Sequence, residues 1–270
     1  MTRLRAATRR WPAVAVALAA ACAAILVAGL AGRSPSPHRA AGTGLSALPA
    51  PRAPAFTPGR PTRLGSTREL TRWAPVRAPV VARGAPDPGA PALATLSTRT
   101  PEGTDNAVEV LDRRTDGAGR PWLRVALPVL PNGTTGWVPR GALGGYQTVD
   151  TRLVIDLRTL RATLLRRGRV VLRAPVGVGR AGWPTPRGTF LVRNRLTRYR
   201  GATYGPVAFG TSARSPRATD WPAGGFVGIH GTDRPDLVPG RISHGCIRLR
   251  NADILALDRR MPIGTPVIIR

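Results

Sequence analysis

The sequence predicts a mostly β chain with a single late helix, arranged as two β-rich domains behind an apolar N-terminal segment and a spacer. From residue 69 onward, short apolar runs alternate with turn residues, which is typical of strands. Only the stretch that starts at Asn251 combines a capping residue with apolar positions at helical spacing. At 270 residues the chain is long enough for two small domains.

Residues 1–32 are predicted to be a membrane anchor or a signal peptide. Several arginines precede an uncharged run, residues 11–32. As a helix rising about 1.5 Å per residue, this run would span a bilayer core of about 30 Å. Its length favours an uncleaved anchor, whereas the small residues at 29–31 offer a cleavage site. Because the arginines lie on the N-terminal side, we expect the rest of the chain to be extracytoplasmic, either anchored or secreted.

Residues 33–68 are predicted to be a disordered spacer. The segment is rich in Pro, Ala, Ser and Gly and shows no hydrophobic periodicity. Such a composition buries too little apolar surface to offset the entropy of ordering. We therefore expect the spacer to hold the folded part of the chain away from the membrane.

The charge of the chain is strongly positive, with 41 basic and 14 acidic residues and a net charge of +27. All the basic residues are arginine, so a compositional bias of the genome explains the excess without any functional demand. The functional alternative is attraction to a polyanion, such as an anionic wall polymer or a membrane surface. Nucleic acid is not expected, because no stretch interleaves aromatic residues with the arginines.

Residues 69–146 are predicted to form a first β domain. Strand patterns occur at 108–111, 122–125 and 136–138, and the turn residues Pro131-Asn132-Gly133 separate the last two. An Asn-Gly pair between such runs is a strong hairpin signal. The recurrence of Trp-x-x-Val and Gly-Trp-Val resembles a small bacterial SH3-like barrel. Trp122 and Trp137 would then pack in its core rather than form a binding surface.

Residues 147–270 are predicted to form a second β domain. The pattern favours a helix from Asn251, which we expect to cap it. The expected strands are residues 153–157, 160–165, 170–176, 189–192, 226–230 and 267–269.

The reactive residues of the chain gather in this second domain. Cys246 is a lone thiol, since the other cysteine, Cys22, lies in the apolar N-terminal run. Of three histidines, His230 and His244 lie within sixteen residues of Cys246. A thiol with a pKa near 8.5 needs a neighbouring base to act as a nucleophile at neutral pH. Spacing alone leaves either histidine as that base, and a zinc site formed by all three residues is an alternative.

Five segments of this domain carry a specific resemblance. Together they resemble the signature of the YkuD-type L,D-transpeptidase family, whose catalytic domain is a β-sandwich-like fold. The segments are Ile229-His230-Gly231-Thr232, Ser243-His244-Gly245-Cys246-Ile247-Arg248-Leu249, Thr185-Pro186-Arg187-Gly188-Thr189-Phe190, Asn251-Ala252-Asp253-Ile254 and Gly264-Thr265-Pro266-Val267.

The resemblance implies a role for each residue of the motif. Cys246 would be the nucleophile and His230 the general base, with the carbonyl of Gly231 orienting the imidazole. His244 and Gly245 would contribute backbone N–H groups to the oxyanion hole. The residues expected to contact substrate are Ser243, Arg248 and Tyr204. No metal and no organic cofactor is implied.

The function implied is that of a peptidoglycan L,D-transpeptidase, which acts on donor and acceptor stem peptides and forms 3→3 cross-links. Three alternatives stay open. Water in place of the acceptor amine would give an L,D-carboxypeptidase, and a protein amine would give attachment of a protein to the wall. A non-catalytic wall-binding protein would have no need of the Cys246–His230 pair.

Overall fold

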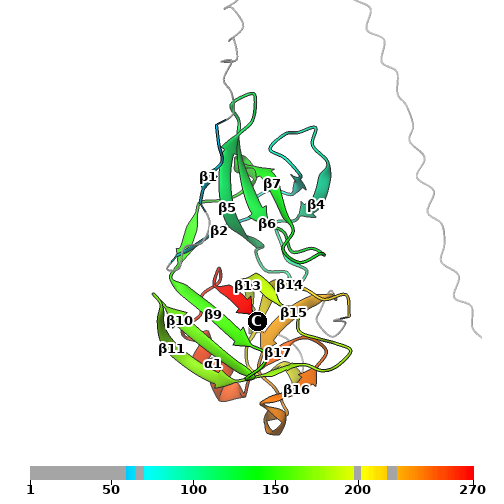
Figure 1. Ribbon diagram of the computed structural model, residues 1–270, viewed down its shortest axis with the longest axis vertical. Helices are drawn as coiled ribbons and strands as arrows, with labels where there is room; N and C mark the ends of the chain where they lie inside the picture. Colours follow the sequence, from blue (N-terminus) through cyan, green and yellow to red (C-terminus); the bar gives the residue numbers. More distant parts are fainter. Residues whose placement is uncertain (1–58, 65–69, 198–201, 218–223) are drawn as a thin grey trace, which may run out of the picture. The chain divides into compact units, whose positions relative to one another are not determined.

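The strands of the computed structural model lie in two hydrogen-bonded sheets (Figure 1). The described residues are 59–64, 70–197, 202–217 and 224–270. The predicted anchor or signal peptide and most of the predicted spacer lie outside these ranges. Within them, no helix is both long and apolar enough to cross a membrane.

The first sheet has eight strands in the order β4-β3-β7-β6-β5-β2-β8, with β1 paired to β5. A short 3₁₀ helix, η1 (Arg140–Ala142), follows β7. The strands are β1 (Thr62–Arg63), β2 (Thr71–Pro75), β3 (Val80–Arg83), β4 (Ala92–Leu96), β5 (Ala107–Thr115), β6 (Pro121–Ala126), β7 (Thr135–Pro139) and β8 (Gln147–Val149).

The three strands predicted for the first domain are confirmed as β5, β6 and β7, and β6 pairs with β7 as an antiparallel hairpin. Apolar residues from these strands, such as Val110, Leu123 and Val138, form a core of their own. Trp122 and Trp137 are buried, which confirms a packing role for both indoles. The SH3-like identity of this sheet stays a prediction.

The first sheet extends beyond both of its predicted boundaries. Thr62 and Arg63 belong to the predicted spacer, but they pair with Arg113 and Asp112 of β5. Residues 147–149 belong to the predicted second domain, but as β8 they pair with β2. In both cases backbone hydrogen bonds to a strand distant in sequence define the element, and local composition does not reveal such pairing.

The second sheet has ten strands in the order β11-β10-β9-β18-β13-β14-β15-β17-β12-β16. Two 3₁₀ helices, η2 (Ala202–Tyr204) and η3 (Pro235–Leu237), and one α-helix, α1 (Asn251–Asp258), join its strands. The strands are β9 (Thr151–Asp156), β10 (Arg161–Arg166), β11 (Arg169–Pro175), β12 (Gly177–Gly179), β13 (Gly188–Leu196), β14 (Ala208–Arg214), β15 (Phe226–His230), β16 (Gly240–Ser243), β17 (Ile247–Arg248) and β18 (Pro266–Ile269).

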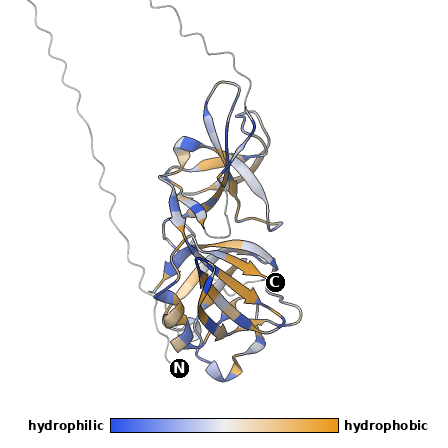
Figure 2. Ribbon diagram, turned by 60° about the vertical axis from the view of Figure 1, so that its left-hand side comes forward, coloured by the Kyte–Doolittle hydropathy of each residue, from blue (hydrophilic) through white to orange (hydrophobic). Residues whose placement is uncertain are grey.

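One hydrophobic core serves the whole second sheet. Strands β9 and β10, near one end of the strand order, contribute Leu153 and Leu164 to this core. Strands β14 and β15, further along the order, contribute Phe209 and Ile229, and α1 contributes Leu257. Because strands from both parts of the series contribute to one core, the sheet must curve around it, in keeping with a sandwich-like arrangement. Figure 2 shows the hydrophobic residues that run along these strands.

The six strands predicted for the second domain are confirmed as β9, β10, β11, β13, β15 and β18. The predicted helix is α1, but Asn251 does not cap it. The N-cap residue is Arg250, which makes no side-chain capping bond, and Asn251 is the first residue of the helix. Its side-chain oxygen instead accepts the backbone N–H of Thr232, because this group lies within reach across the fold.

Candidate active site

Cys246 is presented by a tight turn between β16 and β17. The backbone φ of Gly245 is +119°, a conformation that side chains with a Cβ rarely adopt. The hydroxyl of Ser243 donates to the carbonyl oxygen of Cys246 at 2.6 Å and accepts the N–H of Gly245 at 3.1 Å. Ser243 therefore closes the turn that holds the thiol.

The thiol itself is nearly buried, with 6 % of Cys246 exposed, and forms no disulfide. The backbone N–H of Gly228 in β15 donates to Sγ at 3.3 Å. A hydrogen bond donated to sulfur stabilises the thiolate relative to the thiol. The nucleophile thus already has one backbone group that supports its reactive form.

His230 reaches the same part of the sheet from the end of β15. Strands β15 and β17 are parallel neighbours, with Ile229 opposite Ile247 and His230 opposite Arg248. Because side chains alternate between the faces of a strand, His230 and Arg248 lie on one face. Cys246, two residues before Arg248, directs its sulfur to Gly228, two residues before His230.

The His230 imidazole is almost fully buried, with 1 % exposed, and its orientation is fixed. Its Nδ1 lies 2.6 Å from the carbonyl oxygen of Gly231. Since a carbonyl oxygen only accepts, Nδ1 carries the hydrogen and Nε2 is the nitrogen that can take a proton. The Tyr204 ring meets the imidazole edge-on, with the ring centroids 4.8 Å apart.

The carbonyl of Gly231 is held in place by the packing around it. Asn251 Oδ1 accepts the N–H of Thr232 at 2.9 Å. A Cβ at Gly231 would lie 2.4 Å from the same Oδ1 and 3.0 Å from the Cα of Gly205. Glycine is therefore required at position 231, and the Asn251 amide fills the space beside it.

His244 has different surroundings. Its Nε2 lies 2.6 Å from a guanidinium nitrogen of Arg180, and its ring lies 5.2 Å from that of Trp183. Because a guanidinium only donates, Nε2 of His244 is the acceptor in this contact. The partners of the two histidines differ. His230 is buried and contacts a backbone carbonyl, whereas His244 contacts an exposed arginine. The spacing in the sequence could not make this distinction.

The loop between β12 and β13 is fastened to the catalytic turn. The hydroxyl of Thr185 donates to the carbonyl of Gly245 at 2.8 Å and accepts the N–H of Gly179 at 2.9 Å. The N–H of Arg180 donates to the carbonyl of Ser243 at 3.0 Å. The turn and the loop therefore form one hydrogen-bonded unit.

Two cations flank the aromatic ring that packs with the cysteine. Phe226 belongs to the same apolar cluster as Cys246, and its ring lies 4.4 Å from the guanidinium of Arg193 and 4.2 Å from that of Arg214. Burial lowers the pKa of Arg193 to about 10, against the opposing effect of the Glu102 carboxylate. Arg193 still carries its charge at neutral pH.

The structure also qualifies three expectations about the site. The N–H of Gly245 is engaged by Ser243, so in this state it shapes the turn, and its place in an oxyanion hole stays a prediction. For the zinc alternative, no three His, Cys, Asp or Glu side chains among the described residues are grouped as metal ligands. Arg248 is half-buried and its Nε has no hydrogen-bond partner among the described residues, so its contact with substrate stays a prediction.

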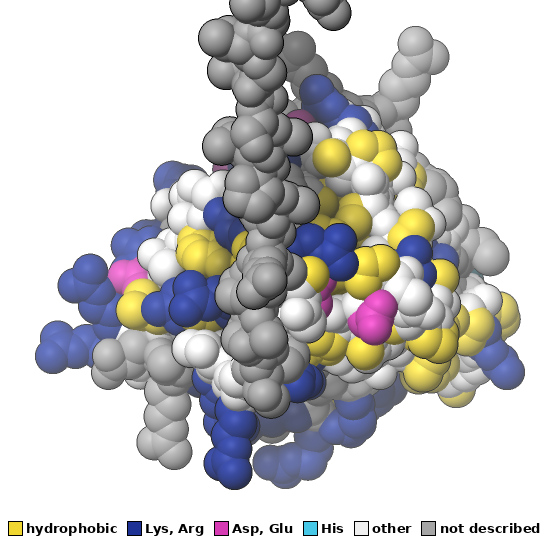
Figure 3. All heavy atoms as spheres, turned by 90° about the horizontal axis from the view of Figure 1, so that it is seen from above, with side chains coloured by type: hydrophobic (Ala, Val, Ile, Leu, Met, Phe, Trp, Pro, Cys, Tyr) yellow, Lys and Arg dark blue, Asp and Glu magenta, His cyan; other side chains and the backbone are white. Residues whose placement is uncertain are grey.

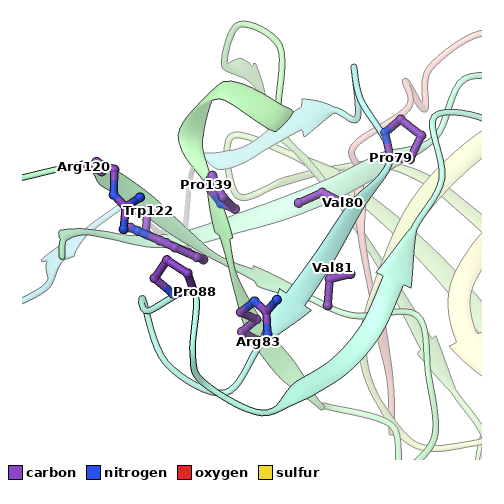
Figure 4. Close-up of a pocket in the computed structure, with 8 residues that line it drawn as sticks. All are labelled: Pro79, Val80, Val81, Arg83, Pro88, Arg120, Trp122 and Pro139. Atoms are coloured by element: carbon purple, nitrogen blue, oxygen red, sulfur yellow. The ribbon is translucent and has the colours of Figure 1, made fainter. Parts of the chain in front are cut away.

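One pocket of the first sheet contains none of these residues. It has a volume of about 380 Å³ and a mostly apolar lining (Figure 4). Residues that line it include Pro79, Pro88, Trp122 and Pro139. The residues of the candidate chemistry, Cys246 and His230, lie in the second sheet.

For several residues that shape the site, the sequence does not reveal their contacts. Gly228 acts through its backbone N–H, which no residue pattern reveals. Arg180 is one of 41 arginines, so nothing singles it out. Thr185 was part of a recognised motif, but its bond to the catalytic turn became visible only in three dimensions.

Comparison with known proteins places the second sheet in a family. A family model for the L,D-transpeptidase catalytic domain, YkuD, matches residues 150–269. The YkuD protein of Bacillus licheniformis is 36% identical over 124 residues, which cover 45% of this chain and 67% of that relative. The YbiS protein of Escherichia coli is 32% identical over 136 residues, covering 44% of each chain. The names of both relatives assign them to the L,D-transpeptidases.

A solved relative is the catalytic domain of the Enterococcus faecium L,D-transpeptidase, which is 28% identical and covers 45% of this chain and 97% of that one, with a TM-score of 0.35. The assignment rests on the sequence relatives and on the motif-bearing residues in the second sheet. The chain belongs to the L,D-transpeptidase family.

Proposed function

We propose that the chain is a peptidoglycan L,D-transpeptidase that forms 3→3 cross-links through a thioester on Cys246. The observation that carries the proposal is that backbone groups hold both the sulfur of Cys246 and the imidazole of His230. Sγ of Cys246 accepts the N–H of Gly228, and the neighbouring His230 has Nδ1 fixed on Gly231, so that Nε2 can take a proton. Such a pair suits acyl transfer by a cysteine nucleophile.

In the first step, Nε2 of His230 takes the thiol proton and Sγ attacks the carbonyl carbon of the third residue of a tetrapeptide stem. The amide bond to the terminal D-Ala then breaks. The imidazolium returns the proton to the leaving amine, which departs as free D-Ala and leaves a thioester.

In the second step, the side-chain amine of a diamino acid on another stem attacks the thioester carbonyl. His230 accepts a proton from this amine, the carbon–sulfur bond breaks, and the proton returns to the sulfur. The product is an amide between the third residues of two stems. Water in place of the amine would give a shortened stem, and a protein amine would give a protein–wall linkage.

We assign the catalytic domain to the outside of the cell membrane, because its stem-peptide substrates lie there and because residues 1–32 have the pattern of an anchor or signal peptide. Arginine side chains outnumber acidic ones on the face shown in Figure 3. This surface is suited to anionic wall polymers or to a membrane surface. The first sheet, as an SH3-like domain, would space or dock the catalytic domain.

The test is incubation of the purified protein with disaccharide-tetrapeptide, followed by mass analysis of the products. A dimer that has lost one D-Ala supports transpeptidation, and a disaccharide-tripeptide alone supports the carboxypeptidase. A reaction mixture that stays unchanged while the protein is folded would overturn the proposed function and favour a non-catalytic wall-binding role.

A further inference from the structure

Arg180, Trp183 and His244 form a cluster beside the catalytic turn that the proposed chemistry does not use. The guanidinium of Arg180 lies 4.6 Å over the Trp183 ring, and it is 2.6 Å from Nε2 of His244. The Trp183 and His244 rings are 5.2 Å apart. Each member thus contacts the other two, and we call this group the Arg180 cluster.

The Arg180 cluster has a fixed position relative to the nucleophile. The N–H of Arg180 and the hydroxyl of Thr185 bond to backbone carbonyls of the catalytic turn. A Cβ at Gly179 would lie 2.1 Å from the carbonyl oxygen of Trp183, so the loop folds back on a position that only glycine can occupy. His244 is two residues from Cys246, and each extended residue spans at most about 3.6 Å. The backbone of His244 therefore lies within about two residue lengths of the backbone of Cys246, and the cluster adjoins the turn that carries the sulfur.

The charge of Arg180 has no counter-charge in the described part of the chain. Some arginines of the second sheet pair with carboxylates, as Arg195 does with Asp258 and Arg167 with Asp150. Arg180 is exposed and makes no such ion pair with any described residue. An exposed cation held in one orientation by uncharged partners is ready to receive an anion.

The geometry of the cluster suits a carboxylate in particular. Because one guanidinium nitrogen contacts His244, the other N–H donors of the planar group remain for a ligand. A planar fork of donors matches the two oxygens of a carboxylate. Trp183 is itself 37% exposed and adds an apolar surface beside the fork.

We propose that the Arg180 cluster binds the terminal carboxylate of the donor peptide. This inference rests on the proposed function, in which the bond that breaks lies one residue before the C-terminus of the donor. The terminal carboxylate is then about one residue length beyond the carbonyl that Cys246 attacks, and the Arg180 cluster adjoins the turn that carries Cys246. Arg180 thereby selects donors whose chain ends one residue after the reacting carbonyl.

The kinetic test compares a tetrapeptide donor with its C-terminal amide, using release of the terminal residue as the readout. Wild-type protein should prefer the free acid by about 10- to 100-fold in kcat/KM, the range expected for a charge-assisted hydrogen-bonded pair. Arg180→Gln should lose most of this preference by slowing the acid and leaving the amide unchanged. Arg187→Gln removes the same charge from the same loop and should keep the preference.

A binding test separates this inference from the proposed function. The Cys246→Ala protein, with and without Arg180→Gln, is titrated with the acid and the amide, and the two dissociation constants are compared. Tighter binding of the acid that depends on Arg180 supports the subsite, even if the wild-type protein catalyses no release. Equal binding of acid and amide, or a preference that Arg180→Gln leaves intact, overturns the subsite, even if transpeptidation is observed.

Discussion

The two sheets of this molecule bury polar groups in contrasting ways. In the first sheet, buried Asp116 receives hydrogen bonds from the Trp122 indole, the Arg120 side chain and the backbone N–H groups of Ala118 and Arg120. All these donors lie within six residues of the carboxylate. The acceptor is saturated by its own hairpin, so the network supports the fold and offers nothing to a substrate.

In the second sheet, the two catalytic side chains are each held by a backbone group. Gly228 holds the sulfur of Cys246, Gly231 holds Nδ1 of His230, and Asn251 holds the loop that follows. The contact on Nδ1 of His230 leaves Nε2 to take a proton, and the contact on Sγ of Cys246 supports the reactive atom itself. The contrast teaches that a buried polar group becomes functional when its partners orient it, and structural when they saturate it.

The largest effect should come from removing the nucleophile. Cys246→Ala should abolish both release of D-Ala and cross-linking, because no other described thiol can form the thioester. The thermal midpoint should change little, since the replacement removes one buried sulfur atom. The assay is product mass from disaccharide-tetrapeptide alongside thermal unfolding, and undiminished product would disprove the thiol mechanism.

A smaller effect should follow from loosening the loop that orients the base. Asn251→Ala leaves the N–H of Thr232 without its acceptor and opens space beside Gly231. We expect kcat to fall about tenfold, because a misplaced catalytic group loses much of its effect. We also expect unfolding to become easier by about 1–3 kcal/mol, the cost of an unsatisfied buried donor.

The matched control for this prediction is Asn251→Asp, which keeps an oxygen acceptor at the same place. This variant should retain more of kcat than Asn251→Ala. Equal losses in kcat for the two variants would show that the acceptor oxygen does not position the base.

The smallest effect on activity should come from the first sheet. Burial acts to raise the pKa of Asp116, but hydrogen bonds from Trp122, Arg120 and Ala118 outweigh it and lower the pKa from 3.8 to about 2. A lowered pKa in the folded state stabilises the protein above about pH 4, and this contribution is lost as the pH falls toward 2.

Asp116→Asn should therefore lower the thermal midpoint at neutral pH, flatten its decline between pH 4 and pH 2, and leave kcat unchanged. The measurement is thermal unfolding across that pH range together with turnover at neutral pH. A variant that keeps the wild-type acid dependence would show that the Asp116 network is not the source of this stability.

Much of this fold was predictable from the sequence, because strands with a buried face leave a local pattern. The strands at 108–111 and 226–230 and the helix after Asn251 all follow from periodicity and turn residues. The pairing of residues 62–63 with β5 and of 147–149 with β2 did not follow, since these contacts join segments far apart in the sequence.

The site was predictable as a set of reactive residues but not as an arrangement. The rarity of cysteine and histidine pointed to Cys246, His230 and His244, and spacing could not choose between the histidines. In the structure, the hydrogen-bond partners distinguish the two histidines. His230 contacts a backbone carbonyl and His244 contacts an arginine. Asn251 was expected to cap α1, because asparagine often caps the helix that follows it. Its side chain instead accepts a hydrogen bond from Thr232, which is nineteen residues away in the sequence.

The most direct test of the role of His230 measures how replacement of each histidine changes the reactivity of the Cys246 thiol. Cys246 is alkylated with iodoacetamide near pH 7, and the rate is followed by intact-protein mass in wild type, His230→Gln and His244→Gln. If His230 activates the sulfur, His230→Gln should slow alkylation by about tenfold or more, because a free thiol is mostly protonated at this pH. His244→Gln should stay within about twofold of wild type. The reverse order would contradict the assignment of His230 as the base.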